Sequence, residues 1–285
     1  MTVAKYVEFA EEVGKAKNIT AVKRKLKEEV QYLENACSSI NFLKTTFTKY
    51  RNYLKQNLSP KAKIGETLLL PLLLDSLRLT KSQQQEFNNA KSSEIKLAKN
   101  SLRAIYSVDE YIKVASSLLD SVSYLDKIIG LCALTGRRAA EIACTAKLTP
   151  VNESIIVFEG QLKTKERIDC LPYQIPVLGH PDKIIGALKA IRELKPQLID
   201  NPTLFHDTAS KDLSIRVKKH FSKLLEGVPK IKDLRAAYAT ICCNEFHKTP
   251  ANRRTDRDVF FSRVLGHAKD DISTCASYVD FYIEE

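Results

Sequence analysis

Glycine and proline are scarce in this chain of 285 residues, which contains only 9 and 10 of them. Both residues interrupt regular secondary structure, so their scarcity favours a protein rich in helix. Hydrophobic residues make up 44% of the chain and charged residues 28%, a balance that allows real cores and is not typical of disordered proteins. The sequence also lacks internal repeats and low-complexity tracts.

The seven cysteines lack the spacing of a metal site. No C-x-x-C pattern occurs, Cys242 and Cys243 are adjacent, and an odd count argues against a disulfide framework. We therefore expect reduced, mostly buried thiols, no metal and a cytoplasmic protein. Residues 1–15 carry acids where a signal peptide needs an apolar core, and the strongest apolar run, 68–74, is short and interrupted by Pro71. We expect no membrane association from such a run.

Acidic residues are absent between Glu34 and Glu66. The six basic residues of this interval are Lys44, Lys49, Arg51, Lys55, Lys61 and Lys63. Apolar residues recur in the same interval at helical spacing, and they are Leu43, Phe47, Tyr50 and Leu54. A helix with an apolar inner face and a basic outer face is suited to lie along DNA phosphates.

The net charge of +11 is concentrated in the first part of the chain. Residues 1–105 carry +9 and residues 106–285 carry +2. This excess favours a polyanionic partner, either nucleic acid or an acidic membrane surface, although a basic surface can also serve solubility alone.

The predicted fold is mainly α with a small β-sheet or hairpin. We expect helices within 2–58, 66–79 and 81–104, which form a basic helical domain over 1–105, and a second domain over 106–285. β-Branched and aromatic residues at 154–159 and an extended stretch at 167–177 predict the hairpin. The remaining helices are predicted at 108–119, 122–134, 137–146, 181–195, 211–226, 231–247 and 258–265.

A glycine turn that leads into a helix places one arginine where it can bind an anion. Gly136 permits the tight entry, and Arg138 falls in the first helical turn. An arginine there can bind two phosphate oxygens, assisted by the backbone N–H groups of the helix terminus. Glu141, three residues further on, can hold the guanidinium; alternatively the two form an ordinary surface ion pair.

Two later segments carry lysine and arginine in contexts suited to phosphate chemistry. Lys163 lies at the predicted hairpin turn, where its amine can protonate a leaving oxygen, and Lys165 is an equally good chemical candidate. Lys232 and Arg235 are three residues apart at the start of a predicted helix, so both cations share one helix face. Each feature also has an ordinary structural interpretation.

His267 and Tyr278 complete an ordered set. His267 follows a glycine, where it can donate to a phosphate, and Tyr278 lies 11 residues later. The order is Arg, Lys, Lys-x-x-Arg, Gly-His and Tyr, spread over five segments. Together the residues suit the binding of a DNA phosphodiester while a tyrosine attacks it, although none of them is specific by itself.

Residues 107–283 resemble the tyrosine recombinases, the superfamily shared by integrases, site-specific recombinases and type IB topoisomerases. Within it, the chain is most similar to the telomere resolvases, or protelomerases. The resemblance is carried by the doubled arginine of TGRRxxE (135–141), by FEGQLKT (158–164), by DLRAxYAT (233–240), and by Lys232 where ordinary recombinases usually have the histidine of H-x-x-R.

The resemblance implies a mechanism. Tyr278 would be the nucleophile that forms a 3′-phosphotyrosine, and Lys163 would be the general acid for the 5′-oxygen. The other implied site residues are Arg138 and Arg235 on the non-bridging oxygens, Lys232 and His267 in the phosphate shell, and Glu141 behind Arg138. No metal, ATP or other cofactor is implied.

The resemblance also implies the partner. The substrate would be double-stranded DNA with an inverted repeat, cut on both strands by a dimer and resealed as covalent hairpin ends. Residues 1–105 would form the core-binding domain of a bacterial, phage or plasmid protein associated with the nucleoid. An integrase-type recombinase and a non-catalytic DNA-binding relative are the alternatives, and Tyr282 is an alternative nucleophile.

Two features depart from the resolvase pattern. The chain is much shorter than the known resolvases and has no recognisable DNA-binding extension after Tyr278. The spacing from His267 to Tyr278 is also slightly longer than in plain recombinases.

Overall fold

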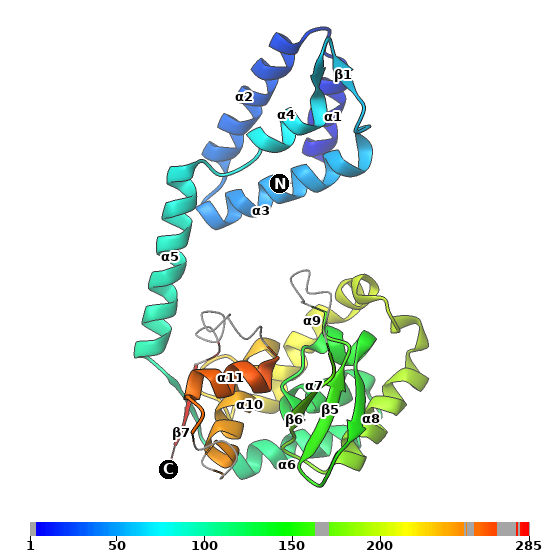
Figure 1. The fold of residues 1–285 in the computed structure, drawn as a ribbon, viewed down its shortest axis with the longest axis vertical. Helices are drawn as coiled ribbons and strands as arrows, with labels where there is room; N and C mark the ends of the chain where they lie inside the picture. Colours follow the sequence, from blue (N-terminus) through cyan, green and yellow to red (C-terminus); the bar gives the residue numbers. More distant parts are fainter. Residues whose placement is uncertain are drawn as a thin grey trace. The chain divides into compact units, whose positions relative to one another are not determined.

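The computed structural model describes residues 4–162, 171–247, 249, 254–266, 278 and 280–284. The chain divides into two compact units, 1–94 and 95–285 (Figure 1). Helices dominate both units, and the described strands form three small sheets. The prediction of a mainly helical protein with a small β component is therefore confirmed.

The first unit is a cluster of helices with one short hairpin. Its elements are α1 (Ala4–Gly14), α2 (Ile19–Ala36), α3 (Ile40–Asn57), β1 (Lys63–Ile64), β2 (Thr67–Leu68) and α4 (Leu69–Ser76), followed by α5 (Lys81–Asn100), which ends in the second unit. The predicted apolar stripe of α3 is confirmed, because Leu43, Phe47, Tyr50 and Leu54 are all buried in the core of this unit. Asn18 and Ser39 accept hydrogen bonds from backbone N–H groups and so cap α2 and α3.

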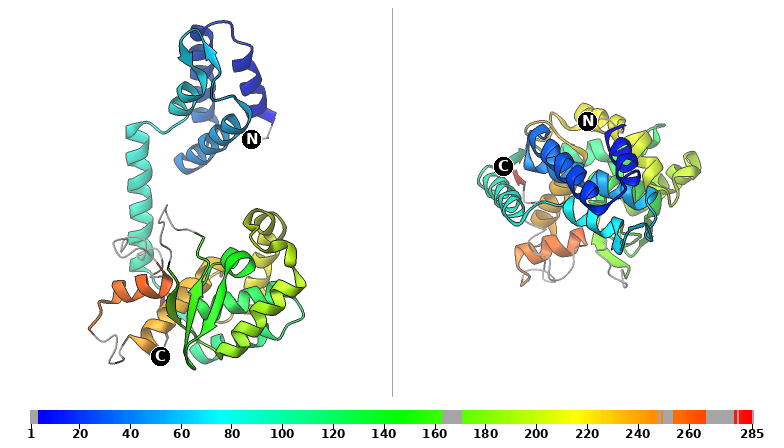
Figure 2. Two further views of the ribbon diagram at one scale, coloured as in Figure 1. Left: turned by 45° about the vertical axis from the view of Figure 1, so that its right-hand side comes forward. Right: turned by 90° about the horizontal axis from the view of Figure 1, so that it is seen from above.

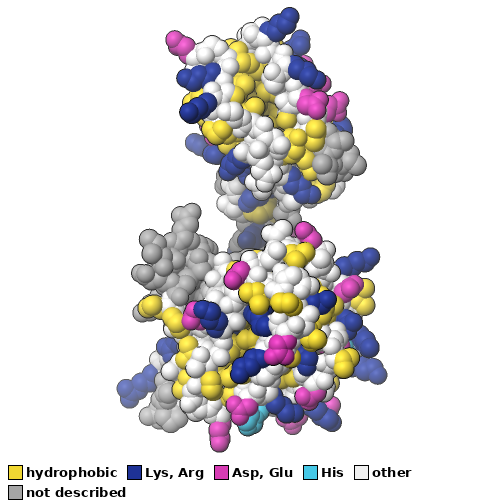
Figure 3. Space-filling model, turned by 90° about the vertical axis from the view of Figure 1, so that its right-hand side faces the viewer, with side chains coloured by type: hydrophobic (Ala, Val, Ile, Leu, Met, Phe, Trp, Pro, Cys, Tyr) yellow, Lys and Arg dark blue, Asp and Glu magenta, His cyan; other side chains and the backbone are white. Residues whose placement is uncertain are grey.

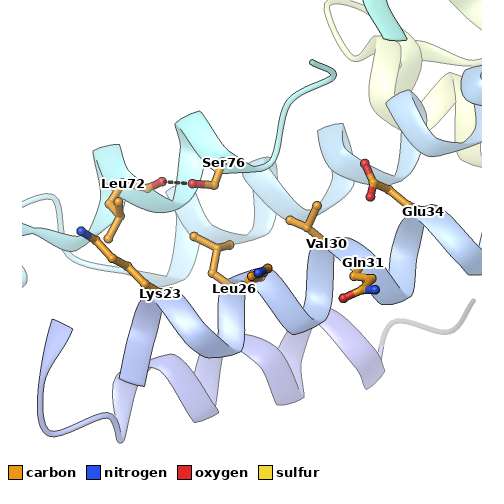
Figure 4. A pocket seen from close by; sticks show the side chains of 8 residues that line it. Lys23, Leu26, Val30, Gln31, Glu34, Leu72 and Ser76 are labelled. Atoms are coloured by element: carbon orange, nitrogen blue, oxygen red, sulfur yellow. Dashed lines mark hydrogen bonds between the residues drawn. The ribbon is translucent and has the colours of Figure 1, made fainter. Parts of the chain in front are cut away.

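A groove of about 630 Å³ lies between α2 and α4 of the first unit. Figure 4 shows Leu26, Val30 and Leu72 along it, with Lys23 and Glu34 toward its two ends. Charges of both signs are present, so the groove has no clear preference for an ionic ligand.

The second unit is built around two buried helices, α7 (Tyr124–Thr135) and α10 (Ile231–Phe246). Ten residues of α7 are buried, because other helices contact it on several sides. Its remaining helices are α6 (Val108–Leu119), the π-helix η1 (Glu141–Thr145), α8 (Pro181–Leu194), the 3-10 helix η2 (Pro196–Leu198), α9 (Pro202–Phe221) and α11 (Arg257–Leu265).

An antiparallel sheet of three strands, ordered β4-β5-β6, contains the predicted hairpin (Figures 1 and 2). The strands are β4 (Lys147–Pro150), β5 (Ile155–Glu159) and β6 (Tyr173–Pro176). Phe158 on β5 is paired with Tyr173 on β6. The turn that joins β5 and β6 includes 163–170, which lie outside the described residues.

A parallel pair of strands connects the two ends of the second unit. β3 (Arg103–Ile105) pairs with β7 (Phe281–Ile283), so that Arg103 lies opposite Phe281. The boundary predicted after residue 105 assigns 103–105 to the first domain, whereas this pairing attaches them to the second unit. Neither strand was predicted, because three-residue strands give too short a periodic signal.

Two predicted helices differ from the structure for local reasons. The predicted helix 137–146 begins two residues later, at Ala139, and from Glu141 to Thr145 it is a π-helix, which is followed by β4. Helix α9 begins at Pro202 and not at residue 211. The Asn201 side chain caps it, because Oδ1 accepts a hydrogen bond from the backbone N–H of Leu204 at 3.1 Å. An asparagine cap followed by proline at the first helical position is a regular start signal.

Candidate active site

Arg138 and Glu141 are held together by the turn that follows α7. Gly136 ends that helix in the left-handed conformation (φ 66°), and a Cβ there would collide with the ring of Tyr238. Arg138 Nη1 donates to Glu141 Oε1 at 2.6 Å, and the Arg138 backbone N–H donates to Oε2 at 3.0 Å. The contact expected from the sequence spacing is present. Because Glu141 is only 1% exposed, it is not an ordinary surface pair.

Arg235 reaches the same place from the first turns of α10. It is 3% exposed and donates to the carbonyls of Gly136 and of Leu265, the latter at 2.6 Å. Its Nε is buried without a hydrogen-bond partner among the residues that the structure describes. A buried guanidinium N–H of this kind is suited to donate to an anion oxygen.

Tyr278 lies beside both arginines. The Arg235 guanidinium carbon is 5.3 Å from the centroid of the Tyr278 ring. Burial alone would lower the pKa of Arg138, but Glu141 and the Tyr278 hydroxyl raise it above its usual value. Tyr282, the alternative nucleophile, is 43% exposed in β7, where it is paired with Ala104. Of the two tyrosines, Tyr278 is the one with described contacts to the arginines.

The cluster carries a buried positive charge. Arg137 lies next to Arg138 and is 1% exposed; it donates to Thr135 O at 3.1 Å, to Val264 O and to the Tyr173 hydroxyl. Burial and the two neighbouring arginines lower the pKa of Arg235 to about 10. Three guanidinium groups therefore surround one carboxylate, Glu141, so an anion would relieve their mutual repulsion.

The structure gives a different environment to Lys232. Its side chain is exposed and lines a cavity of about 330 Å³ with Ser101, Arg103, Val228, Lys230, Asp233 and Asp280. No described contact joins Lys232 to Arg138 or Arg235, although Asp280 is only two residues after Tyr278. Lys163, Lys165 and His267 lie outside the described residues.

Two residues in or near the cluster, Arg137 and Arg103, were missed by sequence reasoning. Arg137 had one signal, its place in the doubled arginine. Arg103 had none, because its partners are distant in sequence: it pairs with Asp233 at 3.1 Å and with Asp280 at 3.8 Å, and it stacks on Phe281. Among the described residues, no group of three or more His, Cys, Asp or Glu could hold a metal ion.

Most of the basic residues predicted to contact DNA are exposed in the first unit. Lys49, Lys55, Lys61 and Lys63 are exposed. Lys44 lies over the Phe87 ring at 3.7 Å, and Arg51 donates to Thr48 Oγ1 at 3.1 Å. Figure 3 shows basic side chains spread over one face of this unit. Of the helices searched in the described part of the chain, none combines the length and apolar character of a membrane span.

The model of the telomere resolvase ResT/TelK catalytic domain family matches residues 101–281. The chain belongs to this family. It is 33% identical over 174 residues to a protelomerase of Yersinia phage PY54, covering 57% of this chain and 28% of that protein. It is 21% identical over 178 residues to telomere resolvase ResT of Borreliella burgdorferi, covering 62% of this chain and 39% of that protein. The matches span well under two thirds of these relatives.

Solved structures of telomere resolvases share the fold. A protelomerase TelA variant complexed with a DNA hairpin product superimposes with a TM-score of 0.85 at 21% identity, covering 98% of this chain and 88% of that chain. Protelomerase TelK complexed with substrate DNA gives a TM-score of 0.65 at 18% identity, covering 99% and 58% of the two chains. At these identities the likeness extends to the fold alone.

Proposed function

We propose that this chain is a telomere resolvase, which cuts DNA at an inverted repeat and reseals each end as a covalent hairpin. The observation that carries the proposal is the cluster of Tyr278, Arg138 and Arg235 around buried Glu141 in a chain of this family. This arrangement supports the proposal, because the proposed nucleophile lies beside the cations proposed to bind the phosphate. The non-catalytic alternative requires no such arrangement.

In the proposed reaction, the Tyr278 hydroxyl releases its proton to solvent and its oxygen attacks the scissile phosphorus. A P–O bond to tyrosine forms, the P–O5′ bond breaks, and Lys163 transfers a proton to the leaving 5′-oxygen. Arg138 and Arg235 bind the non-bridging oxygens, where negative charge grows in the transition state. The bond energy is retained in the 3′-phosphotyrosine, so resealing by a 5′-hydroxyl requires no energy source.

We infer that Lys232 and His267 complete the phosphate shell, and that Glu141 orients Arg138 through its two hydrogen bonds. Lys232 and Asp280 line the same cavity. The exposed side chain of Lys232 must therefore turn when DNA binds in order to reach the phosphate. The exposed lysines of the first unit, together with Lys44 and Arg51, contact the DNA backbone. Cleavage of two strands calls for two active sites, hence a dimer on DNA, acting in the cytoplasm of a bacterium.

The test uses a labelled linear DNA that carries an inverted repeat from the host replicon, incubated with the full chain in EDTA without ATP. Hairpin products that run as one double-length strand on a denaturing gel, and that disappear in Tyr278→Phe, are expected. Exchanged strands between two duplexes would instead assign an integrase-type recombinase. Absence of any covalent protein–DNA adduct would leave a DNA-binding protein.

A further inference from the structure

The carbonyl end of the π-helix Glu141–Thr145 is bound by an arginine from another helix. Arg192, in the last turn of α8, is half-buried and donates from Nη1 to Ala143 O and from Nη2 to Ala146 O, the latter at 3.3 Å. The last carbonyls of a helix have no partner within it and carry the negative end of its dipole. A guanidinium is planar and has several donors, so it can satisfy two such carbonyls at once.

A second contact ties the same segment to the residue that follows β5. The Thr145 hydroxyl donates to the carbonyl oxygen of Gly160. Gly160 has φ 102°, a conformation that favours glycine, and a Cβ there would lie 2.1 Å from Thr145 O. The close approach of the two segments therefore depends on the absence of a side chain at Gly160.

Glu141, the first residue of this π-helix, is the carboxylate that holds Arg138. Its backbone carbonyl accepts the hydrogen bond that closes the π-turn, from Ala146 N at 2.7 Å. Its carboxylate accepts from the side chain and the backbone of Arg138, and Oε1 also accepts from the backbone N–H of Leu162 at 3.4 Å. One π-turn thus links the carbonyls bound by Arg192 to the carboxylate that orients Arg138.

We propose that Arg192 and Thr145 are positioning residues for Arg138 in the proposed reaction. Both hold the π-turn, and the π-turn fixes where the Glu141 carboxylate meets the guanidinium. π-Turns are rare in proteins and are frequently found at functional sites. A shift of Glu141 would displace Arg138 from the non-bridging oxygen that it is proposed to bind. The inference rests on the proposed function, because it assigns both residues a task in DNA cleavage.

The test changes the charge that Arg138 has to stabilise. The Arg192→Met and Thr145→Val variants of the whole chain are compared with the unaltered chain in single-turnover cleavage of ordinary DNA and of DNA with a methylphosphonate at the scissile position. The methyl group replaces one non-bridging oxygen, so the scissile group loses its negative charge and less charge has to be stabilised in the transition state. Both stereoisomers of the methylphosphonate are used, so that each of the two non-bridging oxygens is replaced in turn.

On ordinary DNA we expect Arg192→Met to form the covalent adduct about 100-fold more slowly, a loss typical of a misplaced catalytic group. Thr145→Val, which replaces one hydroxyl by a methyl group, should show a smaller defect. On at least one methylphosphonate stereoisomer, both variants should approach the rate of the unaltered chain, as Arg138→Ala should. DNA affinity should change little.

Two matched controls separate positioning from a loss of stability. Arg216→Met removes a half-buried arginine of the same unit, which donates to Asp126 at 2.8 Å. Thr208→Val removes an exposed hydroxyl that donates to Leu204 O at 2.7 Å. Both controls should cleave ordinary DNA at the normal rate, although Arg216→Met should lower the free energy of unfolding.

Three results would overturn the inference: normal cleavage of ordinary DNA by both variants, a defect of the same size on ordinary DNA and on both methylphosphonate stereoisomers, or an equal defect in Arg216→Met. Thr145→Val changes one hydroxyl only, so it decides the matter if Arg192→Met does not fold. Failure of the proposed function is a separate result, in which the unaltered chain forms no covalent adduct with any of these DNAs.

Discussion

The guanidinium of Arg235 lies over the ring of Tyr278, with its central carbon 5.3 Å from the ring centroid. The two residues are far apart in sequence, and the contact joins a helix of the buried core to the last part of the chain. A cation in this position attracts the face of the ring, and in the proposed reaction it is also placed to bind the scissile phosphate.

Arg235→Lys tests the need for a planar, two-pronged donor. Lysine retains the charge, but its donors lie on one nitrogen and cannot reproduce the planar, spread geometry with which Arg235 reaches Gly136 O and Leu265 O. We expect covalent adduct formation to slow by about 100- to 1000-fold, the usual loss when a transition-state donor is removed. The rate is measured by quenching single-turnover reactions, and DNA affinity is measured separately. A rate within a few-fold of the unaltered chain would exclude Arg235 from the site.

Tyr278→Phe and Tyr282→Phe separate the two candidate nucleophiles. Tyr278 contacts the arginines, whereas Tyr282 is exposed in β7. We expect Tyr278→Phe to abolish the covalent adduct while still binding DNA, and Tyr282→Phe to retain adduct formation. The adduct is scored by its retarded migration in a denaturing protein gel. The opposite pattern would assign the chemistry to Tyr282.

Glu141→Gln tests the carboxylate that balances the three arginines. Burial alone would raise the pKa of Glu141, but Arg138, Arg235 and Arg137 outweigh it and lower the pKa below its ordinary value. The unfolded value is about 4.3, so this carboxylate stabilises the fold above that pH, and the stabilisation is lost as pH falls through the lower, folded value.

The unfolding free energy of Glu141→Gln should therefore depend less on pH below about pH 4.3 than that of the unaltered chain. Near neutral pH the variant should be less stable by about 3–5 kcal/mol, because the arginines lose the buried carboxylate that balances their charge. Urea denaturation at a series of pH values measures both effects. Parallel pH curves for the two proteins would contradict the assigned ion pair.

Arg103→Met tests whether β7 is held by charge. Methionine can retain apolar contact with Phe281, but the ion pairs with Asp233 and Asp280 are lost. Because Asp233 is buried, we expect a loss of about 1–3 kcal/mol in unfolding free energy and slower adduct formation, with DNA affinity retained. Arg78→Met, which breaks the exposed pair with Asp75, is the matched control. Equal effects of the two changes would contradict a specific role for Arg103.

Salt dependence tests the exposed lysines of the first unit. Replacing Lys49 and Lys55 by glutamine should weaken binding to all DNA sequences alike and reduce the slope of log affinity against log salt by about 0.9 per lost phosphate contact. Lys15→Gln, at an exposed lysine that pairs with Glu11, should leave the slope unchanged. An unaltered slope in the double variant would place DNA on another surface.

Much of the fold could be predicted because its signals are local. The apolar stripe of α3, the glycine end of α7 and the hairpin strands each depend on residues close in sequence. The i, i+3 contact between Arg138 and Glu141 could be predicted for the same reason. Lys163, Lys232 and His267 keep their predicted roles as proposals, since two lie outside the described residues and Lys232 lines a neighbouring cavity.

The remainder could not be predicted because it depends on long-range pairing. Arg103 has no motif. Asp280 and Phe281 become its neighbours through the pairing of β3 with β7, and Asp233 is brought to it by the packing of α10. The π-helix after Arg138 has no periodic signal of its own, since it is a short local distortion. Arg137 and Arg138 are adjacent and chemically identical. Only burial distinguishes the arginine that supports the neighbouring turns from the one that faces Tyr278.

The pairing of Arg103 with Phe281 also sets the order of events during synthesis. Arg103 leaves the ribosome early, whereas Tyr278 and its anchoring strand are translated some 175 residues later. A contact of such high sequence separation forms late, after the helices between its two halves have folded. The proposed active site is thus assembled last, and we expect a nascent or truncated chain that ends before Tyr278 to bind DNA without cleaving it.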